Sequence, residues 1–395
     1  MNSGIKFKIG VIMKNKIDVI KIKGYDSFKC IADKCKFTCC SGWDINVDSN
    51  TYDKWKSKEN LTYLLDNIRF KKINGKNNYL IKKEIKADCP FLSNKGLCNI
   101  VINEGEDYLS STCKSFPRIE NTFDETKELT LSCSCPEVVN IISNMKENIV
   151  MDSKDESSYI DNLGVLKIRE ALINIIQKED INLGKKLIVS YDMLLNVLHR
   201  EDLTTYEELI DFLDNYNLES YVKEELNKYK RYEKNDTVVY LKEINLLFVE
   251  IIENYRNVPI FEEDLKGIYK FTERINKKSV FIEWENFKNL FEEYDDFNEK
   301  IISSKILSNC ISDDIEEMII SFEMIMLEYL LTRYAVFLKY CINIEKEIDI
   351  EWIKNYTVIF SRIISNNINS VIDFLIETFE DEILELDYLC FLVLS

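Results

Sequence analysis

The chain has 395 residues, of which 46% are hydrophobic and 30% charged, and it contains 21 Phe, 21 Tyr and 4 Trp. This composition excludes a disordered chain, because so many aromatic side chains can bury a large core. The 10 Gly and 4 Pro exclude collagen-like and low-complexity sequences and favour long helices. The length suggests two or three domains.

The net charge of −18 is unevenly distributed along the chain. Residues 1–100 carry 20 Lys and Arg against 10 Asp and Glu, a net of +10, whereas the rest carries 31 against 59, a net of −28. The lysines of the basic part are scattered and form no recognisable nucleic-acid motif, and the acidic part would repel phosphates. We therefore expect no nucleic-acid partner.

No targeting or membrane segment is recognisable in the sequence. The first 13 residues lack the apolar core and the small-residue cleavage site of a signal peptide. The most apolar region, Met318 to Ile344, is interrupted by four charged residues and offers no uninterrupted span. We expect a cytoplasmic protein with no membrane contact. Met13 is a candidate native start, because the family resemblance described below begins near Lys16.

The cysteines are concentrated in the first third of the chain, where nine of the twelve lie between Cys30 and Cys135. Without an export signal, a disulfide framework is not expected, which leaves metal ligation or thiol chemistry. The only histidine, His199, is far from this region, so thiolates would hold any metal. The remaining three cysteines lie in apolar helical contexts and are expected to be buried free thiols: Cys310, Cys341 and Cys390.

The cysteine spacing is irregular and contains no C-x2-C knuckle of the kind found in zinc ribbons. Adjacent cysteines seldom both reach one small ion, whereas an iron–sulfur cluster tolerates irregular spacing. The spacing therefore gives some support to an iron–sulfur cluster and leaves zinc as the alternative. It does not match the C-x3-C-x2-C pattern of radical-SAM enzymes. The pattern reads Cys30-x4-Cys35-x3-Cys39-Cys40, Cys89-x8-Cys98-x14-Cys113 and Cys133-x-Cys135.

Residues 16–140 resemble the flagellin lysine-N-methylases in the order and spacing of their motifs. The middle part of the pattern is shared with a broader group of cysteine-cluster proteins that bind zinc or iron–sulfur. The motifs are Phe28-Lys29-Cys30-Ile31, Cys35, Cys39-Cys40, Gly42-Trp43, Ile45, Cys89-Pro90-Phe91-Leu92, Gly96-Leu97-Cys98-Asn99-Ile100, Gly105-Glu106, Leu109-Ser110, Cys113, Phe116-Pro117-Arg118, Leu131-Ser132 and Cys135-Pro136-Glu137.

The resemblance implies a methyltransferase that uses S-adenosylmethionine and methylates lysine side chains of flagellin. It also implies a cysteine-bound 4Fe–4S cluster. Cys133 matches the motif less well and is not counted among the candidate ligands. Because one cluster takes about four thiolates, only some of the eight candidate ligands would bind iron. These are Cys30, Cys35, Cys39, Cys40, Cys89, Cys98, Cys113 and Cys135.

The sequence does not identify the catalytic groups or the site of the methyl donor. No G-x-G loop is present, so a Rossmann-type methyltransferase domain is not supported. An alternative is that an open iron of the cluster holds the amino and carboxylate groups of the donor. Arg118 is a candidate partner for a carboxylate or for cluster charge. Four acidic residues near the cysteines are candidate bases or outer hydrogen-bond acceptors, and five aromatic residues could line a channel: Asp88, Glu104, Glu106, Glu137, Trp43, Tyr52, Trp55, Tyr108 and Phe116.

The chain after residue 150 has the apolar periodicity of helices. Thr205 and Glu208 form a capping-box pattern that predicts a helix start. Long helical stretches are expected at 236–256, 281–308, 313–343 and 349–380, and a linker at 150–158. We therefore predict a mainly α protein, with a loop-rich cysteine-cluster region at 1–150 and an α-helical domain at 151–395.

Two other functions remain open from the sequence alone. The first is a non-catalytic zinc- or iron–sulfur-binding module whose helical part recruits a partner protein. The second is a purely structural zinc protein. The sequence does not indicate an oligomeric state.

Overall fold

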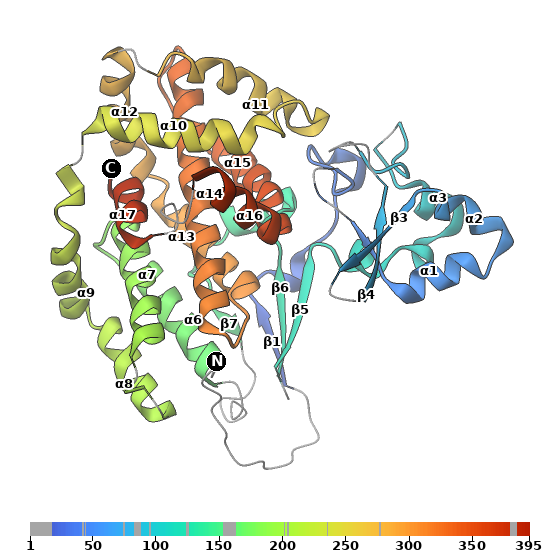
Figure 1. Cartoon of the computed structure of the whole chain (residues 1–395), viewed down its shortest axis with the longest axis horizontal. Coiled ribbons are helices and arrows are strands. Elements are labelled where there is room, and N and C mark those ends of the chain that lie inside the picture. Colours follow the sequence, from blue (N-terminus) through green and yellow to red (C-terminus); the bar gives the residue numbers. More distant parts are fainter. Residues whose placement is uncertain are drawn as a thin grey trace.

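The computed structural model describes residues 18–395 apart from positions 42, 44, 74–75, 83–87, 95, 124–125, 153–162, 201, 204, 235, 276–277 and 380–384. The candidate start at Met13 lies outside the described residues. Most of the predicted linker does so too, and its residues Met151–Asp152 form a short strand, β7. The described chain forms a large helical body, a sheet packed against that body and a small lobe beside it (Figure 1).

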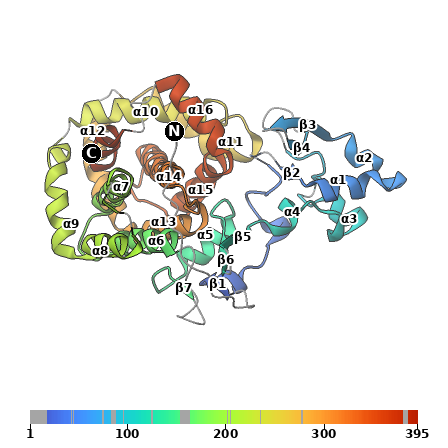
Figure 2. The same ribbon diagram turned by 60° about the horizontal axis from the view of Figure 1, so that its bottom comes forward.

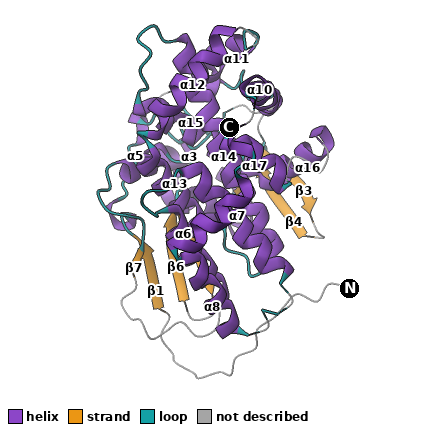
Figure 3. Ribbon diagram, turned by 90° about the vertical axis from the view of Figure 1, so that its left-hand side faces the viewer, coloured by secondary structure: helices purple, strands orange, loops and turns teal. Residues whose placement is uncertain are grey.

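Most of the chain is helical, as predicted, and the strands are few (Figure 3). The long helix α14 (Ile315–Ile342) runs through the middle of the body and is buried along most of its length, with the other helices arranged around it (Figure 2). None of the described helices combines the length and apolar character needed to cross a bilayer. The other helices of the body are α6 (Leu163–Ile176), α7 (Leu183–His199), α8 (Tyr206–Asn217), α9 (Glu219–Glu225), α10 (Thr237–Glu253), α11 (Pro259–Thr272), α12 (Lys278–Glu292), α13 (Asp295–Asn309), α15 (Ile350–Ile363), α16 (Ile368–Phe379) and α17 (Leu386–Leu394).

The helix signals in the sequence are mostly confirmed. Thr205 accepts a hydrogen bond from the Glu208 amide, and the Glu208 side chain accepts one from the Thr205 amide, which is the predicted capping box at the start of α8. The stretches 281–308 and 349–380 each contain two helices instead of one. Pro259 opens α11, because a proline at the first helical position loses no hydrogen bond.

The first sheet joins the beginning of the chain to residues 118–152 in the strand order β5-β6-β1-β7. β1 (Asp18–Ile22) lies parallel to β6 (Thr126–Leu131), and β5 (Arg118–Phe123) pairs with β6 in antiparallel fashion. Its buried side chains, among them Ile22 and Leu131, belong to the same hydrophobic core as the helical body. This part of the predicted first domain therefore packs as one unit with the helices.

The small lobe, residues 45–113, has a separate hydrophobic core around Trp55. Figures 1 and 2 show it at one side of the helical body. Cysteines from three parts of the sequence pack against this core, which places them beside one another. The elements of the lobe are β2 (Asn46–Val47), α1 (Ser49–Lys56), α2 (Thr62–Leu65), β3 (Ile68–Ile73), β4 (Lys76–Ile81), α3 (Asn99–Glu104) and α4 (Ser111–Ser115).

Candidate metal centre

Two cysteine-bearing loops meet at the last turn of α15, around the side chain of Arg362. This side chain is fully buried, and its hydrogen bonds to the described residues all go to backbone carbonyls. Nε donates to Ser134 O at 2.9 Å, in the loop before α5 (Pro136–Ser143). Nη1 donates to Thr38 O at 2.6 Å and Nη2 to Phe37 O at 2.8 Å, in the loop before β2. A longer bond of 3.4 Å joins Nη1 to Ser41 O.

Four candidate cysteines lie close enough to the same guanidinium to interact with its charge: Cys35, Cys39, Cys40 and Cys135. Burial lowers the pKa of Arg362, and these thiols oppose that shift. Burial raises the pKa of Cys35, and it raises the pKa of Cys135 to about 12 although two backbone amides of α5 stabilise the thiolate. The thiols are therefore neutral unless a metal or another cation takes the place of their protons.

Adjacent cysteines connect this group to the small lobe. The Cys39 thiol donates to Cys40, and this hydrogen bond, together with burial, raises the pKa of Cys39. The Cys40 thiol in turn donates to Cys89. That bond and burial outweigh the hydrogen bond from Cys39 and raise the pKa of Cys40 to about 12. Cys40 O also accepts from the Cys89 amide at 2.8 Å, and Cys98 is close enough to Cys40 to affect its pKa.

The other cysteines lie at the edges of this arrangement or outside it. Cys30 is exposed and interacts electrostatically with Cys35. Cys113, in α4, packs against the core of the small lobe together with Cys40 and Cys98. Cys133, which the sequence analysis leaves out, is buried near Lys305 and Glu328 of the helical body instead. Of the eight predicted ligands, seven are thus linked to one another by hydrogen bonds or electrostatic interactions between thiols.

Nevertheless, no three Cys, His, Asp or Glu side chains in the described part of the chain are arranged closely enough to hold a metal ion. The choice of ligands among the eight therefore stays a prediction. The three helical cysteines contribute nothing to this centre: Cys310 and Cys390 are buried in the helical core, and Cys341 packs against it.

The aromatic residues near the cysteines have packing roles. Trp43 Nε1 donates to Cys39 O at 3.0 Å, and its ring lies 5.6 Å from that of Phe116. Trp55 is fully buried and donates to Tyr108 O at 2.9 Å. The Tyr52 ring stacks on Tyr79. The Trp43 hydrogen bond thus holds the Cys39 loop, whereas the contacts of Trp55 and Tyr52 lie within the small lobe.

Arg118 has a local role that its motif did not reveal. Its Nη2 donates to Phe28 O at 3.2 Å, and its guanidinium lies 4.9 Å from the centre of the Phe28 ring. This contact anchors the segment that leads into Cys30. Of the candidate acidic residues, Glu104 accepts a hydrogen bond from Tyr63 at 3.1 Å, and Asp88 and Glu106 are exposed.

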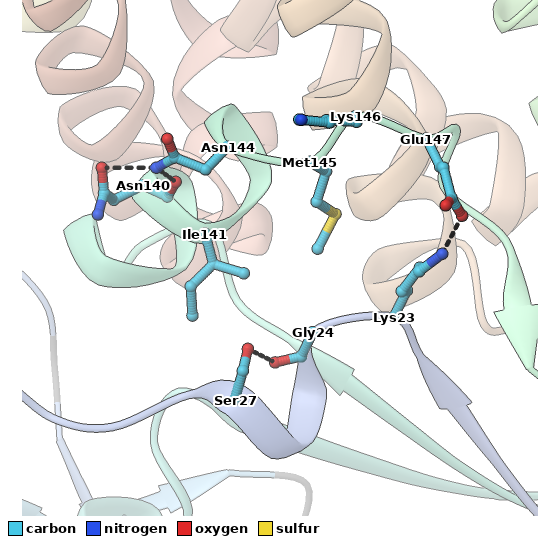
Figure 4. A pocket seen from close by; sticks show the side chains of 9 residues that line it. All are labelled: Lys23, Gly24, Ser27, Asn140, Ile141, Asn144, Met145, Lys146 and Glu147. Carbon is cyan, nitrogen blue, oxygen red and sulfur yellow. Dashed lines mark hydrogen bonds and ion pairs between the residues drawn. The ribbon is translucent and has the colours of Figure 1, made fainter.

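A surface cavity of about 390 Å³ lies at the end of α5 that is remote from the thiols. Lys23 and Glu147 form an ion pair at its rim, and Met145 and Ile141 project into it above Gly24 (Figure 4). Cys135 caps the other end of this helix, and the first cavity-lining residue of the helix, Asn140, lies about 7.5 Å from it along the axis. The cavity mixes apolar and charged groups and does not adjoin the candidate metal centre.

Comparison with known proteins identifies the family of the chain. The family model described as FliB lysine N-methylase C-terminal domain matches residues 169–392. The chain is 33% identical over 135 residues to the "Flagellar biosynthetic protein FliU" of Salmonella muenchen, covering 33% of this chain and 80% of that protein. It is 32% identical over 131 residues to the "Lysine-N-methylase" of Salmonella typhimurium and to that of Salmonella choleraesuis, covering 32% of this chain and about a third of each relative. No solved structure matches the chain.

Proposed function

The chain belongs to the FliB lysine N-methylase family, and from this premise we propose that it transfers methyl groups from S-adenosylmethionine to lysine side chains of flagellin in the cytoplasm. The family match over the helical domain is the observation that carries the proposal. The similarity to a protein named for flagellar biosynthesis supports flagellin as the substrate. A lysine N-methylase is a methyltransferase, and a sulfonium cofactor is the usual methyl source for such a transfer.

We further propose that the thiols around Arg362 bind a 4Fe–4S cluster, with zinc as the less favoured metal. The chemistry of the donor set supports this proposal, because the candidate ligands are thiols that interact with one another and with Arg362, and thiolate sulfur suits an iron–sulfur cluster or zinc. When bound, such a cluster can offer an iron with an open position for the amino and carboxylate groups of the methyl donor. Arg362 would supply a fixed positive charge beside the thiolates that hold the cluster.

The proposed reaction is an in-line displacement. The lysine ammonium first loses its proton, which leaves the ε-nitrogen with a free electron pair. A new N–C bond forms as the C–S bond of the sulfonium breaks, and the electron pair of that bond stays on sulfur to give a thioether. The protein has to align the three atoms and to lower the affinity of the lysine for its proton by partial burial.

The experiment that tests this function measures transfer of labelled methyl groups from S-adenosylmethionine to flagellin, with anaerobically purified protein. Label is expected in flagellin, and prior acetylation of its lysines should abolish the transfer. Absence of label with metal-loaded protein would refute the proposed substrate or the proposed activity. A second protein with exposed lysines distinguishes these two outcomes: label in that protein would refute only flagellin as the substrate, and no label in either protein would refute the activity.

A further inference from the structure

We propose that Arg362 is the positioning residue of the metal centre: it fixes the loop that carries Cys35 and Cys39 against the loop that carries Cys135, so that thiols from both loops serve one centre. This inference rests on the proposed function, because it assigns Arg362 a role in assembling the cluster-binding site. Arg362 comes from the helical domain, whereas all eight candidate ligands come from the first 135 residues.

The hydrogen-bond pattern suits arginine specifically. A guanidinium has five N–H donors in a rigid planar fork, whereas a lysine ammonium is a compact point charge on a flexible stem. Here Nε serves one loop, and the two Nη atoms serve the other. One side chain therefore fixes Ser134, the residue before Cys135, relative to Phe37 and Thr38. These two residues lie between Cys35 and Cys39 in the sequence.

The charge environment supports the same role. Among the described residues, no carboxylate forms an ion pair with Arg362, although the guanidinium is fully buried. A buried cation without a counter-charge is costly. Thiolates bound to a metal centre are anionic, and four candidate thiols surround this guanidinium. The arginine and the loaded centre would compensate each other.

The last turn of α15, which carries Arg362, is held in place by the neighbouring residue Ser361. The Ser361 hydroxyl accepts a hydrogen bond from Lys305 at 2.6 Å and donates one to Glu328 at 2.9 Å. Lys305 and Glu328 also form a buried ion pair between α13 and α14. The last turn of α15 is thus tied to two other helices, and Arg362 projects from it toward both loops.

The test compares Arg362→Lys with a matched control, Arg169→Lys. Arg169 is also a buried arginine of the helical body, and it pairs with Glu128 of β6 away from the candidate ligands. Each protein is purified anaerobically, and its iron content and visible absorption are measured before and after challenge with a chelator. Thermal unfolding and far-UV circular dichroism report the fold of both variants.

We expect Arg362→Lys to weaken metal retention by about tenfold or more, as is typical when a group that orients metal ligands is lost. The control should retain the metal at a similar unfolding temperature. Full retention of the metal with an unchanged spectrum in Arg362→Lys would overturn the positioning role while leaving the proposed function intact.

A second measurement separates the failure of this inference from the failure of the proposed function. If the wild-type protein binds no iron, mild oxidation of the metal-free protein with diamide still reports how the two loops are positioned. Peptide mapping should then find a disulfide between Cys135 and a cysteine of residues 35–40 in the wild type and in Arg169→Lys, and much less of it in Arg362→Lys. Equal yields in all three proteins would refute the positioning role.

Discussion

Arg362 Nε donates a hydrogen bond of 2.9 Å to Ser134 O, and so joins two residues that lie 228 positions apart in the chain. The bond links the helical domain, which carries the family match, to the loop that carries Cys135. Arg362 and the candidate ligands therefore come from different parts of the chain. The following predictions test this arrangement and the packing that supports it.

Replacing Cys135 with serine should lower the metal content of the protein, because this thiol is one of the four around Arg362. Replacing Cys133 with serine should leave the metal content unchanged, because the Cys133 thiol is buried beside Lys305. The two positions are matched in sequence context and burial. Metal analysis and visible absorption of anaerobically purified variants provide the measurement. Equal metal loss in both variants would contradict the assignment of Cys135 as a ligand.

Glu323 should make the protein less stable as the pH rises. Burial raises the pKa of Glu323 to about 7, although the hydrogen bond from Tyr191 acts in the opposite direction. The folded protein thus retains a proton that the unfolded chain releases at its ordinary pKa of 4.5. Below pH 4.5 this proton contributes fully to the free energy of unfolding, and the contribution is lost as the pH rises through about 7. The total loss of unfolding free energy is on the order of 2–3 kcal/mol.

The Glu323→Gln variant should lack this pH dependence, since glutamine can accept the same hydrogen bond without ionising. Urea unfolding of the wild type and the variant at pH 5 and pH 8 measures the difference. Glu377, an exposed glutamate of α16, provides the control substitution to glutamine. An equal pH dependence of the wild type and Glu323→Gln would show that Glu323 does not carry the effect.

Trp55→Ala should unfold the small lobe while the helical body stays folded, because the two parts have separate hydrophobic cores. Truncation of a fully buried tryptophan costs about 3–5 kcal/mol, and this variant also loses the hydrogen bond to Tyr108 O. Limited proteolysis should cut within residues 45–113 of the variant. Phe70→Ala, in the same lobe but 58% exposed, should resist cleavage as the wild type does. Simultaneous unfolding of both parts would contradict the two-core description.

Gly24→Ala should destabilise the protein by about 1–2 kcal/mol, because Gly24 has a φ of +89° and an added Cβ would lie 2.7 Å from Met145 Cε. By contrast, Gly267→Ala should stabilise it by up to about 1 kcal/mol. Gly267 lies inside α11, where a Cβ would meet no atom within 4 Å and alanine has the higher helix propensity. The unfolding midpoints of the two variants provide the comparison, and an unchanged or raised midpoint in Gly24→Ala would refute the explanation given for Gly24.

The helical part of the fold follows largely from local sequence. Apolar periodicity and the capping box at Thr205 depend on residues a few positions apart, and the structure confirms the helices that they indicate. The strands of the small lobe were not predicted, because the runs of β3 and β4 are rich in Lys and Asn and lack clear alternation. The Asn74-Gly75 dipeptide between them was the available hairpin signal.

The candidate site could be predicted only in part, because half of its environment comes from the far end of the chain. The motifs identified the cysteines, and seven of the eight interact with one another in the structure, but which of them bind a metal stays a prediction. The role of Arg362 could not be read from its surroundings in the sequence. Its position between Ile359 and Ile363 on the buried face of α15 was the only hint, since an arginine on an apolar face requires a specific partner.

The most direct test of the account is peptide mass spectrometry of flagellin after incubation with S-adenosylmethionine and the protein in its metal-loaded and metal-free forms. We predict methyl groups on lysine ε-nitrogens with the loaded protein and unmodified lysines with the metal-free protein. Unmodified lysines with the loaded protein, or equal methylation by both forms, would contradict a methylase that depends on a thiolate-bound metal centre.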